Sequence, residues 1–294
     1  FLKAGIVLTR MGTTVSPRYA EEIQTPQYGF GFDGILREGG AKLVGILNGI
    51  DYDQWNPAND PHLPQSYDAE HLDEGKAAAK RRVLEVFGFP VNDATMARPL
   101  IGMVSRMVDQ KGLDLIEAAA GEIATLNATF VIVGTGEPRY QDMWTELSRW
   151  RPDRIRVFVG FDERRAHLVE GGADIFLMPS RFEPCGLNQM YSLRYGTVPV
   201  VRAVGGLVDT VRPHNPTNGQ GNGFLFSEYH PTAMMRAISA ALEAYPNRKI
   251  WTRLQTNGMR AHFSWDRSTG EYVTMYQQLR RRNAGTTPAS KRQR

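Results

Sequence analysis

The stretch Pro179–Met190, PSRFEPCGLNQM, follows an apolar run, Ala173 to Met178, and leads into a helical pattern, Leu187 to Tyr195. Glu183 and Gly186 are therefore expected at the carboxyl end of a buried strand, the edge where open α/β sheets bind ligands. Free N–H groups at a helix start attract anions, and a glycine lets a ligand approach the backbone. A carboxylate there can accept hydrogen bonds from sugar hydroxyls. The stretch predicts a phosphorylated sugar across this turn, with a capped helix after a strand as the plain alternative.

The region from Pro99 onward alternates between strand and helix patterns. The predicted strands are apolar throughout and cover residues 100–104, 130–133, 157–159, 175–178 and 198–201. Between the first strands, apolar residues recur at helical spacing over 113–123 and 140–147. Such apolar strands fit a parallel sheet that is covered on both faces. The predicted fold class is therefore α/β, with a Rossmann-like, doubly wound parallel sheet over residues 99–264.

The flanking regions are less regular. Residues 1–57 contain two short predicted strands, Thr13 to Val15 and Leu43 to Leu47, which are too little to close a core. Residues 58–98 form a connecting segment that is polar at first and becomes helical toward Leu84. Ser264 is placed to cap a last helix over 265–282. Residues 283–294 form a basic tail that is expected to be disordered.

Composition limits the class of protein. The chain has 294 residues, of which 41% are hydrophobic and 22% charged, as in globular proteins. No apolar run approaches the roughly 20 residues of a membrane span, so no membrane partner is predicted. Cys185 is the single cysteine, which excludes an intrachain disulfide and favours a reducing, cytoplasmic location. The six histidines show no paired metal spacing, so no metal is predicted.

The positive net charge belongs to one end of the sequence. Residues 280–294 carry six Lys/Arg and no acid, and without them the formal net charge of +4 becomes −2. Because the excess is confined to a tail, we predict a solvated tail and no nucleic-acid partner.

Two cations flank the end of the first strand of the sheet. Arg106 follows that strand, and Lys111-Gly112 opens the next helix. Cations are unfavourable at a helix N-terminus, but both side chains suit a diphosphate lying between them. The spacing alone is equally typical of a solvated surface. Together with Glu183 on a parallel strand of the same sheet, it favours a diphosphate site.

Other residues fall at the same predicted edge. Gly134–Gly136 and Gly205-Gly206 form further glycine turns, which either bind a ligand or only shape the loops. Phe161 follows the third strand, where it would stack on a nucleotide base or belong to the core.

Three motifs in this order resemble the bacterial glycogen and starch synthases. They are Arg106-x₄-Lys111-Gly112-Leu113-Asp114, the Pro179–Leu187 stretch, and Gly205-Gly206-Leu207-x-Asp209-Thr210-Val211. Upstream elements of the same family follow the same order: Val15-Ser16-Pro17, Thr25-Pro26, Gly31-x-Asp33-Gly34, Asn48-Gly49-Ile50-Asp51 and Trp55-Asn56-Pro57. The resemblance covers nearly everything up to Leu279. It implies the GT-B architecture, with two Rossmann-like domains facing a cleft.

The resemblance also implies an activity. Members of this family transfer glucose from ADP-glucose to the 4-OH of an α-1,4-glucan end, retain the anomeric configuration and use no metal or other cofactor. Arg106 and Lys111 would hold the diphosphate and stabilise charge on the departing ADP. Glu183 would accept hydrogen bonds from glucose hydroxyls and fix the ring.

The resemblance assigns the remaining donor-binding positions as well. Backbone N–H groups of Cys185 and Gly186 would contact the glucose, and those of Leu187 and Asn188 the distal phosphate. Phe161 matches an aromatic position beside the adenine, and the turn at Gly205 and Gly206 would complete the donor side. Tyr191 stands where many related transferases have a second acid, so ribose binding by a carboxylate is not implied there.

One departure from the family pattern is large. The amino-terminal domain, with its Lys-x-Gly-Gly-Leu loop and its histidine, is absent, so residues 1–57 would be its last part. The final helix would normally cross back onto that domain. The chain is therefore expected to carry the donor half of the cleft and to be inactive alone. The alternatives are a UDP-glucose-dependent glucosyltransferase with another acceptor and a non-catalytic nucleotide-sugar or glucan-binding module, although glucan binding alone needs none of Arg106, Lys111 and Glu183.

Overall fold

A computed structural model describes residues 1–38 and 43–284 of the chain. Its centre is a six-stranded sheet in the order β5-β4-β3-β6-β7-β8, and every neighbouring pair is parallel. The strands are β3 (Leu100–Val104), β4 (Thr129–Gly134), β5 (Ile155–Val159), β6 (Ile175–Met178), β7 (Val198–Arg202) and β8 (Phe224–Phe226). The predicted α/β fold class with a doubly wound parallel sheet is confirmed.

The strand order reverses between β3 and β6. The chain runs outward from β3 through β4 to β5, then returns to the other side of β3 and continues through β7 to β8. Ligands of open α/β sheets bind outside the carboxyl ends of the strands at such a switch point. The loops after β3 and β6 are the ones that carry Arg106, Lys111 and Glu183, so the topology brings the predicted site residues to one place.

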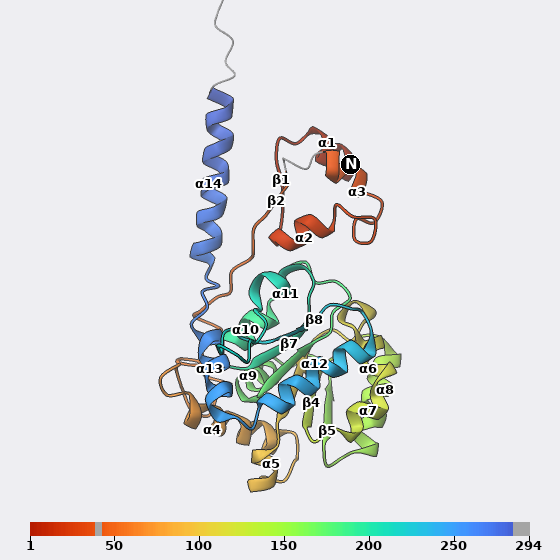
Figure 1. Cartoon of the computed structure of the whole chain (residues 1–294), viewed down its shortest axis with the longest axis vertical. Helices are drawn as coiled ribbons and strands as arrows, with labels where there is room; N and C mark the ends of the chain where they lie inside the picture. Colours follow the sequence, from red (N-terminus) through yellow and green to blue (C-terminus); the bar gives the residue numbers. More distant parts are fainter. Residues whose placement is uncertain (39–42, 285–294) are drawn as a thin grey trace, which may run out of the picture.

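Helices cover both faces of the sheet, which explains why its strands are apolar on both sides (Figure 1). One core packs the sheet against α6 (Leu113–Ala118), α7 (Ala120–Thr125), α8 (Pro138–Trp150) and α12 (Pro231–Ala244). The other core lies under α4 (Leu72–Val86), α9 (Glu163–Gly172), α10 (Asn188–Arg194) and α11 (Gly205–Thr210). Each large apolar side chain buried in these cores contributes about 1.5–3 kcal/mol.

The remaining elements lie around this sheet. They are α5 (Asp93–Ala97), the 3₁₀ turn η2 (Asp109–Lys111), α13 (Arg248–Met259) and α14 (Trp265–Ala284). Figure 1 shows α14 projecting away from the sheet as a straight helix. No helix in the described part of the chain is both long and apolar enough to cross a membrane.

The amino-terminal segment contains α1 (Leu2–Leu8), β1 (Gly12–Thr14), α2 (Pro17–Glu22), α3 (Asp33–Glu38) and β2 (Leu43–Gly45). The strands β1 and β2 pair in parallel as a separate two-stranded sheet. In Figure 1 this segment lies at one end of the molecule, next to α11. Its small sheet agrees with the expectation that residues 1–57 do not form a core of their own.

Some element boundaries differ from the sequence expectations. The predicted helix over 113–123 is divided into α6 and α7 by a non-helical Ala119. A sixth strand, β8, pairs with β7 although its short segment gave no strand pattern. The predicted last helix is present as α14, and the basic tail lies outside the described residues from 285 onward.

Candidate functional site

Lys111 and Glu183 form an ion pair at the switch point. Lys111 Nζ lies 2.6 Å from Glu183 Oε2, although the residues are 72 positions apart. Gly112 makes this approach possible, because its φ is +76° and a Cβ there would lie 2.0 Å from the Pro179 carbonyl oxygen. The loop after β3 therefore packs directly on the loop after β6, and it places a cation beside the acid.

The Glu183 carboxylate is held in a fixed position. Only 5% of the residue is exposed, and Ser180 Oγ donates a second hydrogen bond to the same Oε2 at 3.0 Å. A buried carboxylate costs desolvation free energy unless a cation or hydrogen-bond donors compensate it. Lys111 and Ser180 supply that compensation, so an ionised acid can persist at the mouth of the sheet.

The turn that follows Glu183 presents backbone amides. Gln189 Nε2 donates to the carbonyls of Cys185 at 3.0 Å and Gly186 at 3.1 Å. Because N–H and C=O are antiparallel across a trans peptide, the amides of Gly186 and Leu187 point away from Gln189. Within the described residues, the N–H groups of 185–188 donate to no protein acceptor. This arrangement leaves a set of unpaired donors at the start of α10, as an anion site requires.

Arg106 lies on the same loop as Lys111 and is exposed. Its guanidinium donates to Gln110 Oε1 at 3.0 Å, and Gln110 Nε2 donates in turn to the Phe182 carbonyl at 3.4 Å. The Arg181 amide also donates to the Gln110 carbonyl, at 2.9 Å. Gln110 thus ties the loop that carries both cations to the loop that carries Glu183. The pattern Arg-x₄-Lys gave no indication of this bridge.

The glycine turn at the start of α11 is already engaged. The Gly205 amide donates to both oxygens of Glu22, at 3.0 and 3.1 Å, and the Gly206 amide donates to the Glu183 carbonyl at 3.1 Å. A Cβ on Gly206 would lie 1.9 Å from the Cys185 carbonyl oxygen. Gly205 and Gly206 therefore support the turn that follows Glu183, and their amides are occupied by protein acceptors in this structure.

Glu22 belongs to a reciprocal contact between α2 and α11. While Glu22 at the end of α2 accepts from the start of α11, Asp209 near the end of α11 accepts from the start of α2. Asp209 Oδ2 lies 2.5 Å from Ser16 Oγ and 3.2 Å from the Arg18 amide. Each helix thus provides an acid to the other's orphan N–H groups. Sequence reasoning did not identify Glu22, Asp209 or Gln189, because their partners are remote in sequence.

Tyr191 points into a stack of rings. Its ring lies 3.8 Å from that of Trp55, nearly parallel, and Trp55 stacks in the same way on His167 at 3.8 Å. Burial raises the pKa of Tyr191 to about 12, so it is a neutral phenol at physiological pH. By contrast, Phe161 exposes 88% of its surface just after β5, at the carboxyl edge of the sheet. The core alternative for Phe161 is therefore wrong, because its ring is free to contact a ligand.

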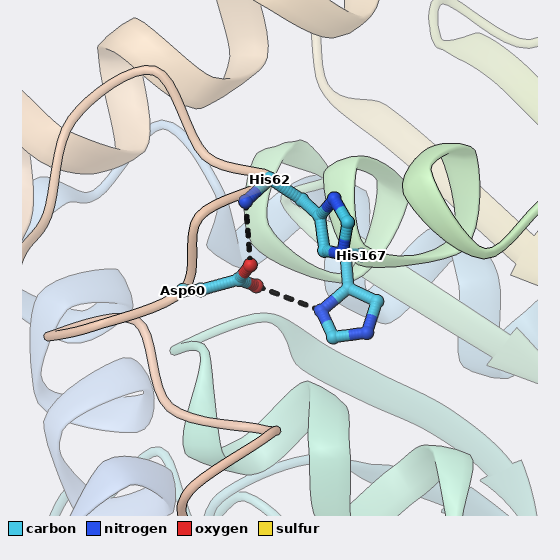
Figure 2. A group of neighbouring side chains, drawn as sticks. All are labelled: Asp60, His62 and His167. Atoms are coloured by element: carbon cyan, nitrogen blue, oxygen red, sulfur yellow. Dashed lines mark hydrogen bonds and ion pairs between the residues drawn. The ribbon is translucent and has the colours of Figure 1, made fainter.

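Asp60, His62 and His167 lie together, with ligand atoms within 4.8 Å of one another (Figure 2). The spacing of the histidines did not indicate this group. Asp60 accepts hydrogen bonds from the His62 amide at 2.8 Å, from Tyr195 Oη at 2.5 Å and from His167 Nδ1 at 2.8 Å. Although burial acts to raise the pKa of Asp60, these hydrogen bonds lower it below its usual value. The group anchors the connecting segment to α9 and α10.

The glycines at 134–136 are explained by packing. A Cβ on Gly134 would lie 1.9 Å from the Ser105 carbonyl oxygen, and one on Gly136 would lie 2.3 Å from the Met107 carbonyl oxygen. Both glycines let the loop after β4 approach the loop after β3. Of the two readings left open by the sequence, this geometry favours the shaping of the loop that carries Arg106.

Two family models match the chain. Residues 89–257 match the model described as glycosyl transferases group 1, and residues 1–38 match the model described as the starch synthase catalytic domain. The first match includes the whole β3–β8 sheet and the residues Arg106, Lys111, Phe161 and Glu183.

Individual relatives agree with these models. The chain is 51% identical over 279 residues to a glycogen synthase of Anaeromyxobacter sp. and 46% identical over 279 residues to one of Kosmotoga olearia. Each match covers 95% of this chain and 58% of the relative. The chain thus spans a little over half the length of the curated relatives it matches.

Solved structures share the fold. The catalytic domain of starch synthase IV from Arabidopsis thaliana, bound to ADP and acarbose, matches with a TM-score of 0.86 and 35% identity over 94% of this chain and 57% of that chain. A sucrose-phosphate synthase from Thermosynechococcus elongatus matches with a TM-score of 0.63 and 20% identity, over 95% of this chain and 60% of that chain, which indicates a shared fold only. The resemblance inferred from the motifs is confirmed, and the chain belongs to the group 1 glycosyltransferases.

Proposed function

We propose that this protein is a glycogen synthase that transfers glucose from ADP-glucose to the 4-OH at the non-reducing end of an α-1,4-glucan, with retention of configuration. The observation that carries the proposal is the Lys111–Glu183 pair, 2.6 Å apart, beside the unpaired amides at the start of α10. A nucleotide-sugar donor requires a cation and N–H groups for its diphosphate and an acid for its sugar. All of these lie together at this edge of the sheet. The similarity to glycogen synthases supports the same donor and acceptor.

The proposed roles are those that the family resemblance implies, and the geometry supports them. The diphosphate lies between Arg106, Lys111 and the amides of Leu187 and Asn188, where two cations and unpaired N–H groups lie at one edge of the sheet. Glu183, together with the amides of Cys185 and Gly186, orients the glucose. Phe161 is exposed and available to stack on the adenine. Tyr191 shapes this end of the site through its stack with Trp55 and supplies no carboxylate for the ribose.

The chemistry breaks the bond between the anomeric carbon and the diphosphate oxygen, and the electron pair stays with ADP. The acceptor hydroxyl attacks the anomeric carbon on the same face of the glucose and gives its proton to the departing phosphate oxygen, so that a new glycosidic bond replaces the broken one. Stabilisation of the leaving diphosphate by Arg106 and Lys111 is the largest contribution, because fixed charges act most strongly in a site closed to water. Glu183 contributes by positioning the sugar. We place residues 1–57, and α14 where it leaves the sheet, at the boundary with the acceptor-binding side.

The test uses the full-length gene product, ADP-glucose and glycogen, with glucose incorporation as the readout. Glu183→Gln is expected to lower kcat more than it lowers ADP affinity, because Glu183 acts on the sugar. The exposed Glu243 on α12 offers a control, since Glu243→Gln is expected to leave both unchanged. Equal loss of ADP affinity and kcat in Glu183→Gln would show that the acid serves the diphosphate instead.

Donor preference is a separate test of the same proposal. We expect kcat/KM for ADP-glucose to exceed that for UDP-glucose by at least about tenfold, which requires only about 1.4 kcal/mol of differential binding in the transition state. Parallel kinetics with the two donors measure this ratio. Equal or better turnover with UDP-glucose would favour the alternative of a UDP-glucose-dependent enzyme. Donor binding without any glucose transfer would favour the non-catalytic binding module.

A further inference from the structure

Glu170 on α9 connects to the start of α10 through a buried hydrogen-bond network. The residue is fully buried, its Oε1 accepts from Asn188 Nδ2 at 3.2 Å, and its Oε2 lies 2.6 Å from Ser192 Oγ. Asn188 is the first residue of α10, and its side-chain amide also donates to the Val104 carbonyl at 3.1 Å, at the end of β3. Glu170 therefore holds the helix start in register with the strand that leads to Arg106.

The network is complete when Glu170 is protonated. Its Oε2–H then donates to Ser192 Oγ, and the Ser192 hydroxyl donates to the Asn188 carbonyl, which lies 2.8 Å away. Asn188 Nδ2 continues to donate to Oε1, so every polar atom has a partner. When Glu170 is ionised, Ser192 must donate to the carboxylate and the Asn188 carbonyl loses this partner. The hydrogen bonds therefore accommodate the neutral acid, and burial decides between the two forms.

Burial without a paired cation favours the neutral form of Glu170. Among the described residues no Lys, Arg or His forms a salt bridge with Glu170. Burial raises the pKa of Glu170 to about 8, against the opposing effects of its hydrogen bonds to Ser192 and Asn188 and the charge of Lys76. Burial also lowers the pKa of Lys76 to about 7, so this lysine compensates Glu170 only weakly above neutral pH. The other titratable groups that face this pair are Tyr67, Tyr191, Tyr195, Asp174 and Lys80.

We propose that Glu170 is a positioning residue that holds the phosphate-binding start of α10 as a neutral acid, and that its ionisation weakens the binding of a nucleoside diphosphate. The inference rests on the proposed function for the location of the diphosphate. A negative charge in the interior, linked directly to the first residue of α10, opposes the partial positive charge of the helix start. A bound diphosphate opposes ionisation of Glu170 to the same extent, because linkage is reciprocal.

The experiment measures ADP affinity of the full-length gene product by calorimetry between pH 7 and 9, where the charge of the phosphates is constant because their second pKa is about 6. We expect the wild-type affinity to fall about fivefold over this range, as Glu170 ionises. Glu170→Gln keeps the donor and acceptor pattern of the neutral acid, and its affinity is expected to match the wild type at pH 7 and to stay constant. Glu163→Gln, which removes an exposed acid from the same helix, is expected to retain the wild-type pH dependence.

A second measurement has a wild-type readout that does not depend on the folding of Glu170→Gln. Titrations of the wild type at pH 8 in two buffers of different ionisation enthalpy report the protons taken up with ADP. We expect net proton uptake, and none in Glu170→Gln. Absence of uptake by the wild type, uptake that persists undiminished in Glu170→Gln, or equal pH dependence in both proteins would overturn the proposal. Because the readout is ADP binding, these outcomes are independent of whether glucose reaches glycogen.

Discussion

Helices α10 and α11 begin at the same edge of the sheet, each after a buried strand and a glycine turn, and neither has a capping side chain of its own. The two starts nevertheless differ in their partners. At α11, Glu22 from the amino-terminal segment accepts from the Gly205 amide. At α10, no carboxylate in the described part of the chain reaches the amides of 185–188.

The comparison shows that similar local sequences serve different purposes. At the start of α11 the N–H of Gly205 is bound by the carboxylate of Glu22. The partial positive charge of this helix start therefore helps to hold the amino-terminal segment against the sheet. The start of α10 remains open, so its charge is available to an external anion. The two helix starts are also connected, because the Gly206 amide donates to the carbonyl of Glu183, where the turn that leads into α10 begins. The position of α11 therefore affects the geometry at α10.

The largest effect is expected from Lys111→Ala, which tests the open helix start. The change removes a charge-assisted contact to phosphate and leaves the buried Glu183 without its cation. We expect kcat/KM for ADP-glucose to fall by an amount equivalent to about 1.5–3 kcal/mol of transition-state stabilisation. Steady-state kinetics on the full-length gene product measure this change. Lys249→Ala removes an exposed lysine on α13 and is expected to change nothing. A loss in Lys111→Ala no greater than in this control would remove Lys111 from the donor site.

The connection between the two helices is tested by Gly206→Ala. A Cβ at this position would lie 1.9 Å from the Cys185 carbonyl oxygen, so the turn that follows Glu183 must move. We expect the free energy of unfolding to fall by about 1–3 kcal/mol, together with weaker ADP binding. Gly121→Ala on α7 is the matched control, because a Cβ there meets nothing within 4 Å. Normal ADP affinity in Gly206→Ala would show that α11 and the turn are independent.

Glu22→Ala tests the closed helix start. This change leaves the Gly205 amide without its acceptor. We expect the free energy of unfolding, measured with denaturant, to fall by about 1–2 kcal/mol. ADP affinity should change less than in Lys111→Ala, since Glu22 does not face the α10 amides. Glu21→Ala, an exposed neighbour on the same helix, supplies the control. If both variants are equally stable, the contact between α2 and α11 contributes little to the fold.

The smallest effect is expected from Leu187→Ser, which gives α10 a capping side chain. Leu187 is the N-cap residue and is 37% exposed, so a serine hydroxyl at this position can accept from the Gln189 amide, the second N–H of α10. We expect stability to rise by about 0.5–1 kcal/mol and ADP affinity to fall about threefold, because the cap competes with phosphate. Thermal unfolding and calorimetry measure the two changes. Higher stability with unchanged ADP affinity would place the phosphate elsewhere.

Much of the fold was predictable from local pattern. The apolar runs predicted β3, β4, β5, β6 and β7, because strands covered on both faces must be apolar on both sides. The gathering of Arg106, Lys111 and Glu183 at one edge was predictable from their positions after these strands, since parallel strands present their carboxyl ends at one edge. The strand β8 and the break between α6 and α7 were not predictable, because pairing with β7 and packing at Ala119 depend on the assembled sheet.

The sequence by itself determined the α/β class, the edge of the sheet at which we propose that the donor binds, and the residues Arg106, Lys111 and Glu183 that lie there. Only the tertiary structure decided which helix start is open and which is closed. Glu22 lies 183 positions from Gly205, and Glu170 lies 18 positions from Asn188 on another helix, so no local pattern joins them. Local sequence fixes backbone geometry within a few residues, whereas hydrogen-bond partners of buried charged groups are fixed by which distant segments pack together.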